Sequence, residues 1–126
     1  RMAQRFGKAE KLKSRKWIEQ IFAEGKTIKA FPILAVFKNF EATDGVAVKA
    51  GFSVSKRKFR NAVDRNLLKR RMRESYRLQK HRIIDPVEPE ITRGVMFVYM
   101  AGKGLKFEEI NKAFEKVLTD LKNLKG

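Results

Sequence analysis

The chain has 126 residues, with 30 Lys and Arg against 14 Asp and Glu, and therefore a formal net charge of +16. Hydrophobic residues make up 43% of it and charged residues 35%, which is enough apolar content for one domain and too much for a wholly disordered chain. The absence of cysteine excludes disulfides, thiolate nucleophiles and cysteine-based zinc sites. The strong positive charge predicts a polyanionic partner, with nucleic acid as the first choice.

No apolar run approaches the roughly 18 residues that a membrane span needs, and the N-terminus lacks the apolar region of a secretory signal. We therefore expect a cytoplasmic protein that has no membrane partner. Residues 1–126 are expected to form a single domain, in which the basic and weakly patterned residues 1–13 are a loose arm.

The first regular element is a predicted short helix after Ser14, whose hydroxyl suits the N-cap position. Gly25 then suits the left-handed position that ends many helices. Between them the apolar residues follow helical spacing, at Trp17, Ile18, Ile21 and Phe22.

Two strands are predicted next, over residues 31–37 and 46–54, and the turn signal at 43–45 indicates an antiparallel hairpin. Pro32 lacks a backbone N–H and therefore belongs at a strand start or on an edge. The second strand alternates, with one face made of Val46, Val48, Ala50, Phe52 and Val54. Its other face is small and polar, and it either meets water or lets another molecule approach closely.

The pattern changes to helix from residue 61 to about residue 82, and a polar loop at 85–90 follows. The continuous apolar run 95–101 predicts a strand that is buried on both faces. The last helix has the clearest apolar stripe, at Phe107, Ile110, Phe114, Val117, Leu118 and Leu121. The order α-β-β-α-β-α predicts an α+β domain in which three helices pack on a small mixed sheet.

Positive charge is concentrated between residues 56 and 82, where twelve cations and only two acids contribute +10 of the +16. At about 100° per residue, one side of the predicted helix carries Arg65, Lys69 and Arg73, with Asn66, Arg70 and Arg77 beside them. The opposite side carries Val63, Leu67, Leu68, Met72 and Leu78, interrupted by Arg71 and Ser75. We therefore expect the apolar side to pack on the sheet and the cationic side to face outward.

Like charges four residues apart on a helix repel each other, so this cationic side needs a compensating anion, which a nucleic-acid backbone supplies. A solvated basic face is the ordinary alternative, but the one-sided arc and the scarcity of acids favour nucleic acid. A basic helix lying on an anionic membrane is a weaker alternative, because the apolar side lacks bulky aromatics and is needed for the core.

Groups able to perform catalysis are scarce. His81 is the only histidine, so a catalytic triad and a histidine-based metal site are excluded, and there is no glycine-rich phosphate loop. Four acids are not distinguishable from ordinary loop and helix-start acids, namely Glu88, Glu90, Glu108 and Glu109. We predict no active site and no metal site in this chain.

Residues 51–57 (GFSVSKR) and 61–74 (NAVDRNLLKRRMRE) resemble the protein subunit of bacterial ribonuclease P. Residues 17–26 resemble the first helix and turn of that family, and the resemblance extends from about residue 11 to residue 121. It implies an α/β sandwich with a left-handed β-α-β crossover. It also implies a monomeric RNA-binding protein, one per RNA, which assists a catalytic RNA in the Mg²⁺-dependent removal of the 5′ leader from precursor tRNA.

The resemblance implies two sets of site residues. Contacts to the catalytic RNA fall on Lys56, Arg57, Asn61, Arg65, Asn66, Lys69, Arg70 and Arg73. A cleft between the sheet and the first helix, which holds the leader, is lined by Ile18, Phe22, Phe37, Ser53 and Lys56. For Phe22 and Phe37, ordinary core packing is the alternative. The chain departs from the family at Leu67, where the family motif has an arginine, and at Ile18, where the family often has an aromatic.

The implied function is that of the protein component of ribonuclease P, an endonuclease whose chemistry is performed by its RNA subunit. The alternative is a general RNA-binding or ribosomal-type protein with no processing role. Both would use the basic helix, so only the leader cleft distinguishes them. A self-sufficient nuclease is disfavoured, because the acid/base and metal-binding groups that it needs are missing.

Overall fold

The computed structural model describes residues 6–41, 44–83 and 91–124. Their elements are η1 (Lys8–Glu10, a 3-10 helix), α1 (Arg15–Glu24), β1 (Lys26–Ala30), β2 (Ile33–Glu41), β3 (Val48–Val54), α2 (Ala62–Gln79), η2 (Lys80–Arg82), β4 (Ile91–Tyr99) and α3 (Phe107–Asn123). The predicted α+β class and its three main helices are confirmed, and the sheet has one strand more than expected, β1. The loop predicted at 85–90 lies outside the described residues. Within the described ranges, no helix is long and apolar enough to cross a membrane.

The four strands form one mixed sheet in the order β1-β2-β4-β3. β2 is antiparallel to both β1 and β4, whereas β3 runs parallel to β4. The predicted antiparallel hairpin between residues 31–37 and 46–54 is therefore wrong, because β4 lies between these two strands. A turn does form at Asp44, whose carboxylate accepts the Val46 N–H at 3.2 Å, and at Gly45, with a φ of 76°. It leads to the far edge of the sheet, and Thr43 lies outside the described residues.

The hairpin partner of β2 is β1, which pairs Lys26 with Phe37 and Ala30 with Ile33. β1 has a single large apolar residue, Ile28, and lies at the edge of the sheet, where polar and charged side chains are common. α2 connects the parallel neighbours β3 and β4 as a β-α-β crossover. The left-handed sense that the family resemblance implies for this crossover stays a prediction.

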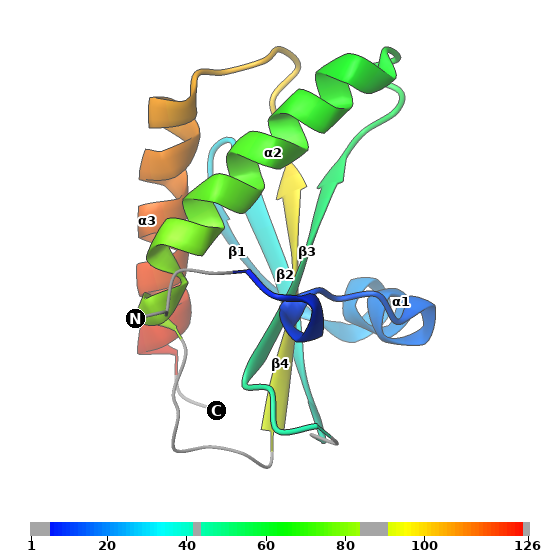
Figure 1. The fold of residues 1–126 in the computed structure, drawn as a ribbon, viewed down its shortest axis with the longest axis vertical. Coiled ribbons are helices and arrows are strands. Elements are labelled where there is room, and N and C mark those ends of the chain that lie inside the picture. The colour runs from blue at the N-terminus through cyan, green and yellow to red at the C-terminus, as the bar shows by residue number, and fades with distance from the viewer. Residues whose placement is uncertain (1–5, 42–43, 84–90, 125–126) are drawn as a thin grey trace.

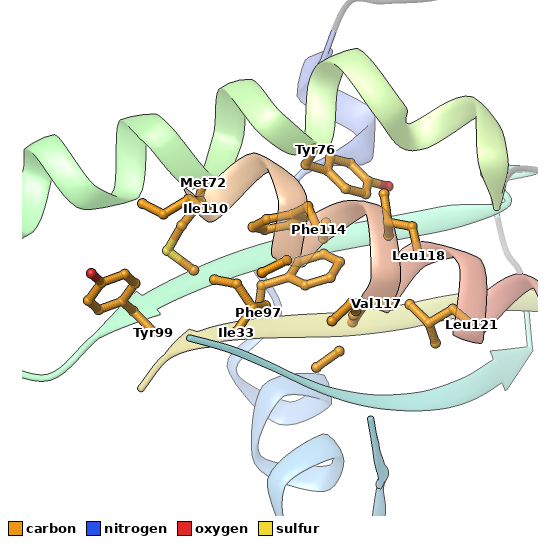
Figure 2. Close-up of a cluster of buried hydrophobic side chains, with 14 of the residues drawn as sticks. Ile33, Met72, Tyr76, Phe97, Tyr99, Ile110, Phe114, Val117, Leu118 and Leu121 are labelled. Atoms are coloured by element: carbon orange, nitrogen blue, oxygen red, sulfur yellow. The ribbon is translucent and has the colours of Figure 1, made fainter. Parts of the chain in front are cut away.

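The elements form three layers, with α2 and α3 on one face of the sheet and α1 on the other (Figure 1). The larger core lies between the sheet and the pair α2 and α3, where side chains of all three interdigitate (Figure 2). Phe97 of β4 is its centre: the ring centroid lies 4.8 Å from that of Phe114 on α3 and 5.4 Å from that of Tyr76 on α2. The predicted stripe of α3 is confirmed by five fully buried residues, Ile110, Phe114, Val117, Leu118 and Leu121.

A smaller core lies between α1 and the opposite face of the sheet, and its buried members are Leu12, Ile21, Val36 and Met96. Beside it Trp17 of α1 stacks on Phe40 of β2, with ring centroids 4.0 Å apart. β4 is therefore buried on both faces, as predicted, because Phe97 points into the larger core and Met96 into the smaller one. The alternation predicted for β3 is also confirmed, with Val48, Ala50 and Val54 in the larger core.

Residues 6–13 pack against the domain, so the loose arm expected over residues 1–13 is wrong for this part; residues 1–5 lie outside the described ranges. The Leu12 N–H donates to the Ala50 carbonyl at 3.0 Å, and Lys11 forms a parallel bridge with Ala50. The Leu12 side chain is only 7% exposed, and Glu10 accepts a hydrogen bond from the Lys80 ammonium at 2.5 Å. Two apolar side chains, Phe6 and Leu12, and one ion pair hold a segment whose composition alone indicates an arm.

α1 begins and ends where predicted, although its last cap differs from the predicted one. Ser14 is the N-cap, and its hydroxyl accepts the Trp17 N–H at 3.2 Å. Gly25 has a φ of −75°, which any residue can adopt. Glycine is needed there because a Cβ would collide with the Ile21 carbonyl oxygen and lie 2.7 Å from the Phe37 carbonyl oxygen. The chain therefore turns from α1 into β1 at a close contact between backbones.

Gly25→Ala is expected to destabilise the protein by about 1–3 kcal/mol, the usual range for forcing atoms into filled space. The measurement is the denaturant midpoint of the purified variant, with Gly102→Ala as the control because a Cβ at Gly102 meets no atom within 4 Å. Equal midpoints for the two variants would show that the backbone around Gly25 yields without loss.

Candidate nucleic-acid interface

The rotation of α2 about its axis is set by its buried row, Leu68, Met72 and Tyr76, which lies against the sheet. The side facing away from this row carries Asn66, Arg70 and Arg73, all exposed. The outward cationic side is therefore present, centred on Arg70.

The predicted apolar side of α2 is wrong in its first half. Val63 is 71% exposed and Leu67 is 40% exposed. The inward direction is that of Leu68, one residue later and about 100° away from Leu67. Tyr76, which the predicted arc leaves out, is fully buried instead. Leu67 therefore lies beside the exposed cations, at the place where the family motif has an arginine.

The arginines of α2 include two groups. Arg65 and Arg71 are hydrogen-bonded to loop carbonyl oxygens, whereas Arg70 and Arg73 are exposed. Arg65 donates to the Phe59 and Arg60 carbonyl oxygens at 2.8 and 3.0 Å. Arg71 donates to the Leu105 carbonyl oxygen at 2.6 Å. These two guanidinium groups hold neighbouring loops against the helix. The predicted line of Arg65, Lys69 and Arg73 is therefore uneven, because the first two are half-buried and only Arg73 is exposed.

Further along α2, Arg77 is paired with Glu74, with 2.6 Å between the nearest nitrogen and oxygen. The hydrogen bond from Arg77 lowers the pKa of the Glu74 carboxyl, because it favours the charged form. This pair reduces the net positive charge towards the C-terminal end of α2.

The loop before α2 is a tight turn that presents further cations. The Ser55 hydroxyl accepts the N–H groups of Arg57 and Lys58 at 3.1 and 3.2 Å, and the Lys58 ammonium donates to the Met100 carbonyl at 3.1 Å. Asn61 caps the helix, since its side-chain oxygen accepts the Val63 N–H at 2.9 Å. Its amide nitrogen is the part left to contact a ligand.

Lys56 and Arg57 are exposed on this loop, which lies at the N-terminal end of α2. The aligned peptide dipoles make that end of a helix positive, and its backbone N–H groups favour anions such as phosphate. The loop and the helix start therefore join the exposed side of α2 in one cationic surface.

The opposite face of the sheet has a row that α1 leaves half-exposed, formed by Leu34, Val98 and Ser53 on neighbouring strands; we call it the open row. Trp17, stacked on Phe40, marks the flank of α1 that is turned away from this row. By helical spacing Ile18 and Phe22 lie on the other flank, towards the open row. Ile18 is half-buried there and Phe22 is 50% exposed.

Three of the five residues predicted for the leader cleft, Ile18, Phe22 and Ser53, therefore lie around the open row, and Lys56 follows β3 at its end. Phe37 does not, and that assignment is wrong. Its side chain is 7% exposed and belongs to the larger core on the α3 side. Successive residues of a strand point to opposite faces, so Phe37 faces away from its neighbour Val36, which contacts the α1 side.

Arg93 accompanies Phe37 on that side: its guanidinium carbon lies 5.5 Å from the ring centroid, and it donates to the Leu121 carbonyl at 3.3 Å. Burial lowers the pKa of Arg93. Leu34 and Val98 were not identified from the sequence as residues of the open row. The alternation along each strand identifies their face only when the pairing of β2 with β4 is known.

The described residues contain no group of three or more His, Cys, Asp or Glu side chains that could hold a metal ion. His81 is exposed in η2. Glu108 and Glu109 lie in the first turn of α3, where Glu109 accepts the Lys106 N–H at 3.2 Å; Glu88 and Glu90 lie outside the described ranges.

Comparison with known proteins gives consistent matches over most of the chain. The family model described as Ribonuclease P matches residues 6–122. The ribonuclease P protein component of Porphyromonas gingivalis is 33% identical over 112 residues, which cover 88% of this chain and 82% of that protein. The component of Chlorobaculum tepidum is 33% identical over 90 residues, covering 69% of this chain and 52% of that protein.

Solved structures share the fold. The RNase P protein of Staphylococcus aureus superposes with a TM-score of 0.69 at 23% identity, covering 91% of this chain and 97% of that one. The protein of Thermotoga maritima gives a TM-score of 0.65 at 22% identity, covering 93% and 99%. These solved structures therefore have the same fold as the one that carries the cationic helix and the open row in this chain. The chain belongs to the ribonuclease P protein family, the bacterial protein subunits that partner an RNA in a ribonucleoprotein of tRNA processing.

Proposed function

We propose that this chain binds the catalytic RNA of ribonuclease P through the cationic surface of α2 and the loop before it. The observation that carries this proposal is the outward row of Asn66, Arg70 and Arg73, which is exposed while the row on the other side of the helix is buried. Each cation that neutralises a phosphate releases condensed counterions, which makes the binding favourable and dependent on salt.

The open row is the proposed site of the 5′ leader of precursor tRNA. It combines apolar side chains, Leu34 and Val98, with the exposed aromatic ring of Phe22, and Lys56 lies at the end of β3. Aromatic rings stack on any base, so such a surface tolerates a leader of variable sequence. Leader and catalytic RNA would then lie on opposite sides of the sheet, both close to the loop between β3 and α2.

The hydrolysis itself is assigned to the RNA subunit, which supplies the Mg²⁺ sites, and no side chain of this chain is given a chemical step. What the protein contributes is positioning: it holds the leader beside the RNA that cuts it. We assign it to the cytoplasm as a monomer, one per RNA.

The decisive experiment is reconstitution with a bacterial catalytic RNA and precursor tRNA at low Mg²⁺. The protein is expected to stimulate leader release and to be inactive when the RNA is omitted. Tight RNA binding without stimulation, across several catalytic RNAs, would favour a general RNA-binding protein instead. Cleavage by the protein alone would overturn the assignment of the chemistry to RNA.

Arg70→Gln and Arg73→Gln should each lower the slope of log affinity against log salt by about one unit, because each removes one phosphate contact. The measurement is binding to the catalytic RNA over a salt series. Arg71→Gln is the contrasting variant, since this guanidinium is bound to the Leu105 carbonyl; it should reduce stability and leave the slope unchanged. Unaltered slopes for Arg70 and Arg73 would remove α2 from the RNA interface.

Phe22→Ala should weaken holoenzyme binding to precursor tRNA about tenfold, in line with the loss of one base–aromatic stack. Binding of mature tRNA, which has no leader, should not change. Phe31→Ala is the matched control, because Phe31 is also an exposed aromatic but lies beside α3. Equal losses for precursor and mature tRNA would contradict the placement of the leader at the open row.

A further inference from the structure

A second cationic site lies away from α2, in a pocket of about 330 Å³ between the N-terminal segment, the start of α1 and β3. In Figure 1 this segment, drawn in dark blue, passes between α2 and α1 in front of the sheet. We call it the N-terminal pocket, and it is lined by Lys8, Ala9, Lys11, Leu12, Lys13, Ser14, Trp17 and Lys49. It lies on the flank of α1 opposite the open row, because Trp17 is on its wall.

The backbone that carries three of these lysines is held in place. The Glu10 N–H donates to the Gly7 carbonyl at 3.1 Å, and the Leu12 N–H donates to the Ala50 carbonyl at 3.0 Å. The Leu12 side chain packs over Gly51, where a Cβ would lie 3.6 Å from its own. The lysine side chains therefore project from a fixed frame, which reduces the entropy that is lost when they bind a ligand.

The charge around the N-terminal pocket is unbalanced. Among the residues that the structure describes, the only acid that binds one of its four lysines is Asp44, which lies 2.8 Å from the Lys49 ammonium, while Glu10 is engaged by Lys80 at 2.5 Å. The first turn of α1 adds Arg15 and Lys16 and has no acid, although the positive end of a helix disfavours cations. Such an accumulation is destabilising in the free protein, and a bound anion would relieve it.

The walls of the pocket favour a nucleotide over a small inorganic anion. Trp17 contributes an aromatic ring, already stacked on Phe40, and the Lys49 ammonium lies 5.7 Å from its centroid. Leu12 adds an apolar surface. Lysines beside aromatic and apolar side chains are typical of sites that bind the backbone and bases of single-stranded RNA.

We propose that the N-terminal pocket binds a phosphate of an RNA strand, as an RNA contact separate from α2 and from the open row. This proposal rests on the proposed function, because it assumes that the chain works on RNA. The phosphate comes from the catalytic RNA or from precursor tRNA, and the chemistry of recognition is the same for both.

The test uses Lys11→Gln/Lys13→Gln, which removes two exposed ammonium groups and leaves the backbone groups of both residues unchanged. Lys112→Gln/Lys116→Gln is the matched control, because it makes the same change of net charge on the exposed side of α3. Salt series are measured for the catalytic RNA alone, and for the holoenzyme with precursor and with mature tRNA. The pocket variant should lower the salt slope by about one to two units relative to the control.

The three arms identify the source of the phosphate. A lower slope with catalytic RNA alone assigns it to that RNA, a loss limited to precursor tRNA assigns it to the leader, and a loss with both tRNAs assigns it to the tRNA body. Slopes equal to those of the control in all arms would overturn the proposal. Arg70→Gln/Arg73→Gln distinguishes failure of the pocket proposal from failure of the proposed function. If this variant lowers the slope and the pocket variant does not, the pocket proposal fails and the proposed function stands.

Trp17 is the only tryptophan of the chain, and it provides a direct second readout. A short single-stranded oligoribonucleotide should change its fluorescence in a saturable way. The pocket variant should need several-fold more oligonucleotide for the same change, whereas Lys112→Gln/Lys116→Gln should respond like the unaltered protein. Equal responses of the pocket variant and the control variant would overturn the proposal.

Discussion

Burial of Leu68, Met72 and Tyr76 beneath α2 is the contact on which the rest of this protein depends. These side chains, spaced four residues apart, belong to the larger core and fix the rotation of the helix; Figure 2 shows Met72 and Tyr76 on the same side of α2 as Phe97. That rotation decides which cations face outward, since neighbouring residues differ in direction by about 100°. It also turns Arg65 and Arg71 towards loop carbonyls. One helix thus supplies both an exposed charged surface and the anchors of its own loops.

The central place of β4 gives the second constraint. Because β4 pairs with β2 on one side and with β3 on the other, α2 must cross over the sheet between β3 and β4. The loop that starts this crossover leaves β3 next to the open row and enters α2 at its positive end. β3 therefore lies beside all three candidate RNA surfaces, since the N-terminal segment also pairs with β3 at Ala50. An excess of cations in such proximity is costly without an anion, which is consistent with an RNA partner.

Local sequence signals predicted the elements that depend on neighbouring residues. The cap at Ser14 and the apolar stripe of α3 involve residues a few positions apart, and both are present. The failures involve distant residues. Phe37 points to α3 because it lies on the same face of β2 as Ile33 and Ala35, which belong to the larger core. Leu67 is exposed because Leu68 is the residue that packs on the sheet. Neither outcome can be predicted from the spacing of apolar residues, because β2 has apolar residues on both faces and α2 has them at both Leu67 and Leu68.

The sequence by itself determined the class of the domain, the position of its helices, the concentration of charge between residues 56 and 82, and the motif that indicates the family. Only the tertiary structure decided the strand order, the rotation of α2 and the ordering of residues 6–13. The reason is physical. Propensity, capping and charge act within a few residues, whereas strand pairing and burial depend on which distant surfaces meet. The lysines around the N-terminal pocket become a site because Leu12, Ala50 and Trp17 are brought together there.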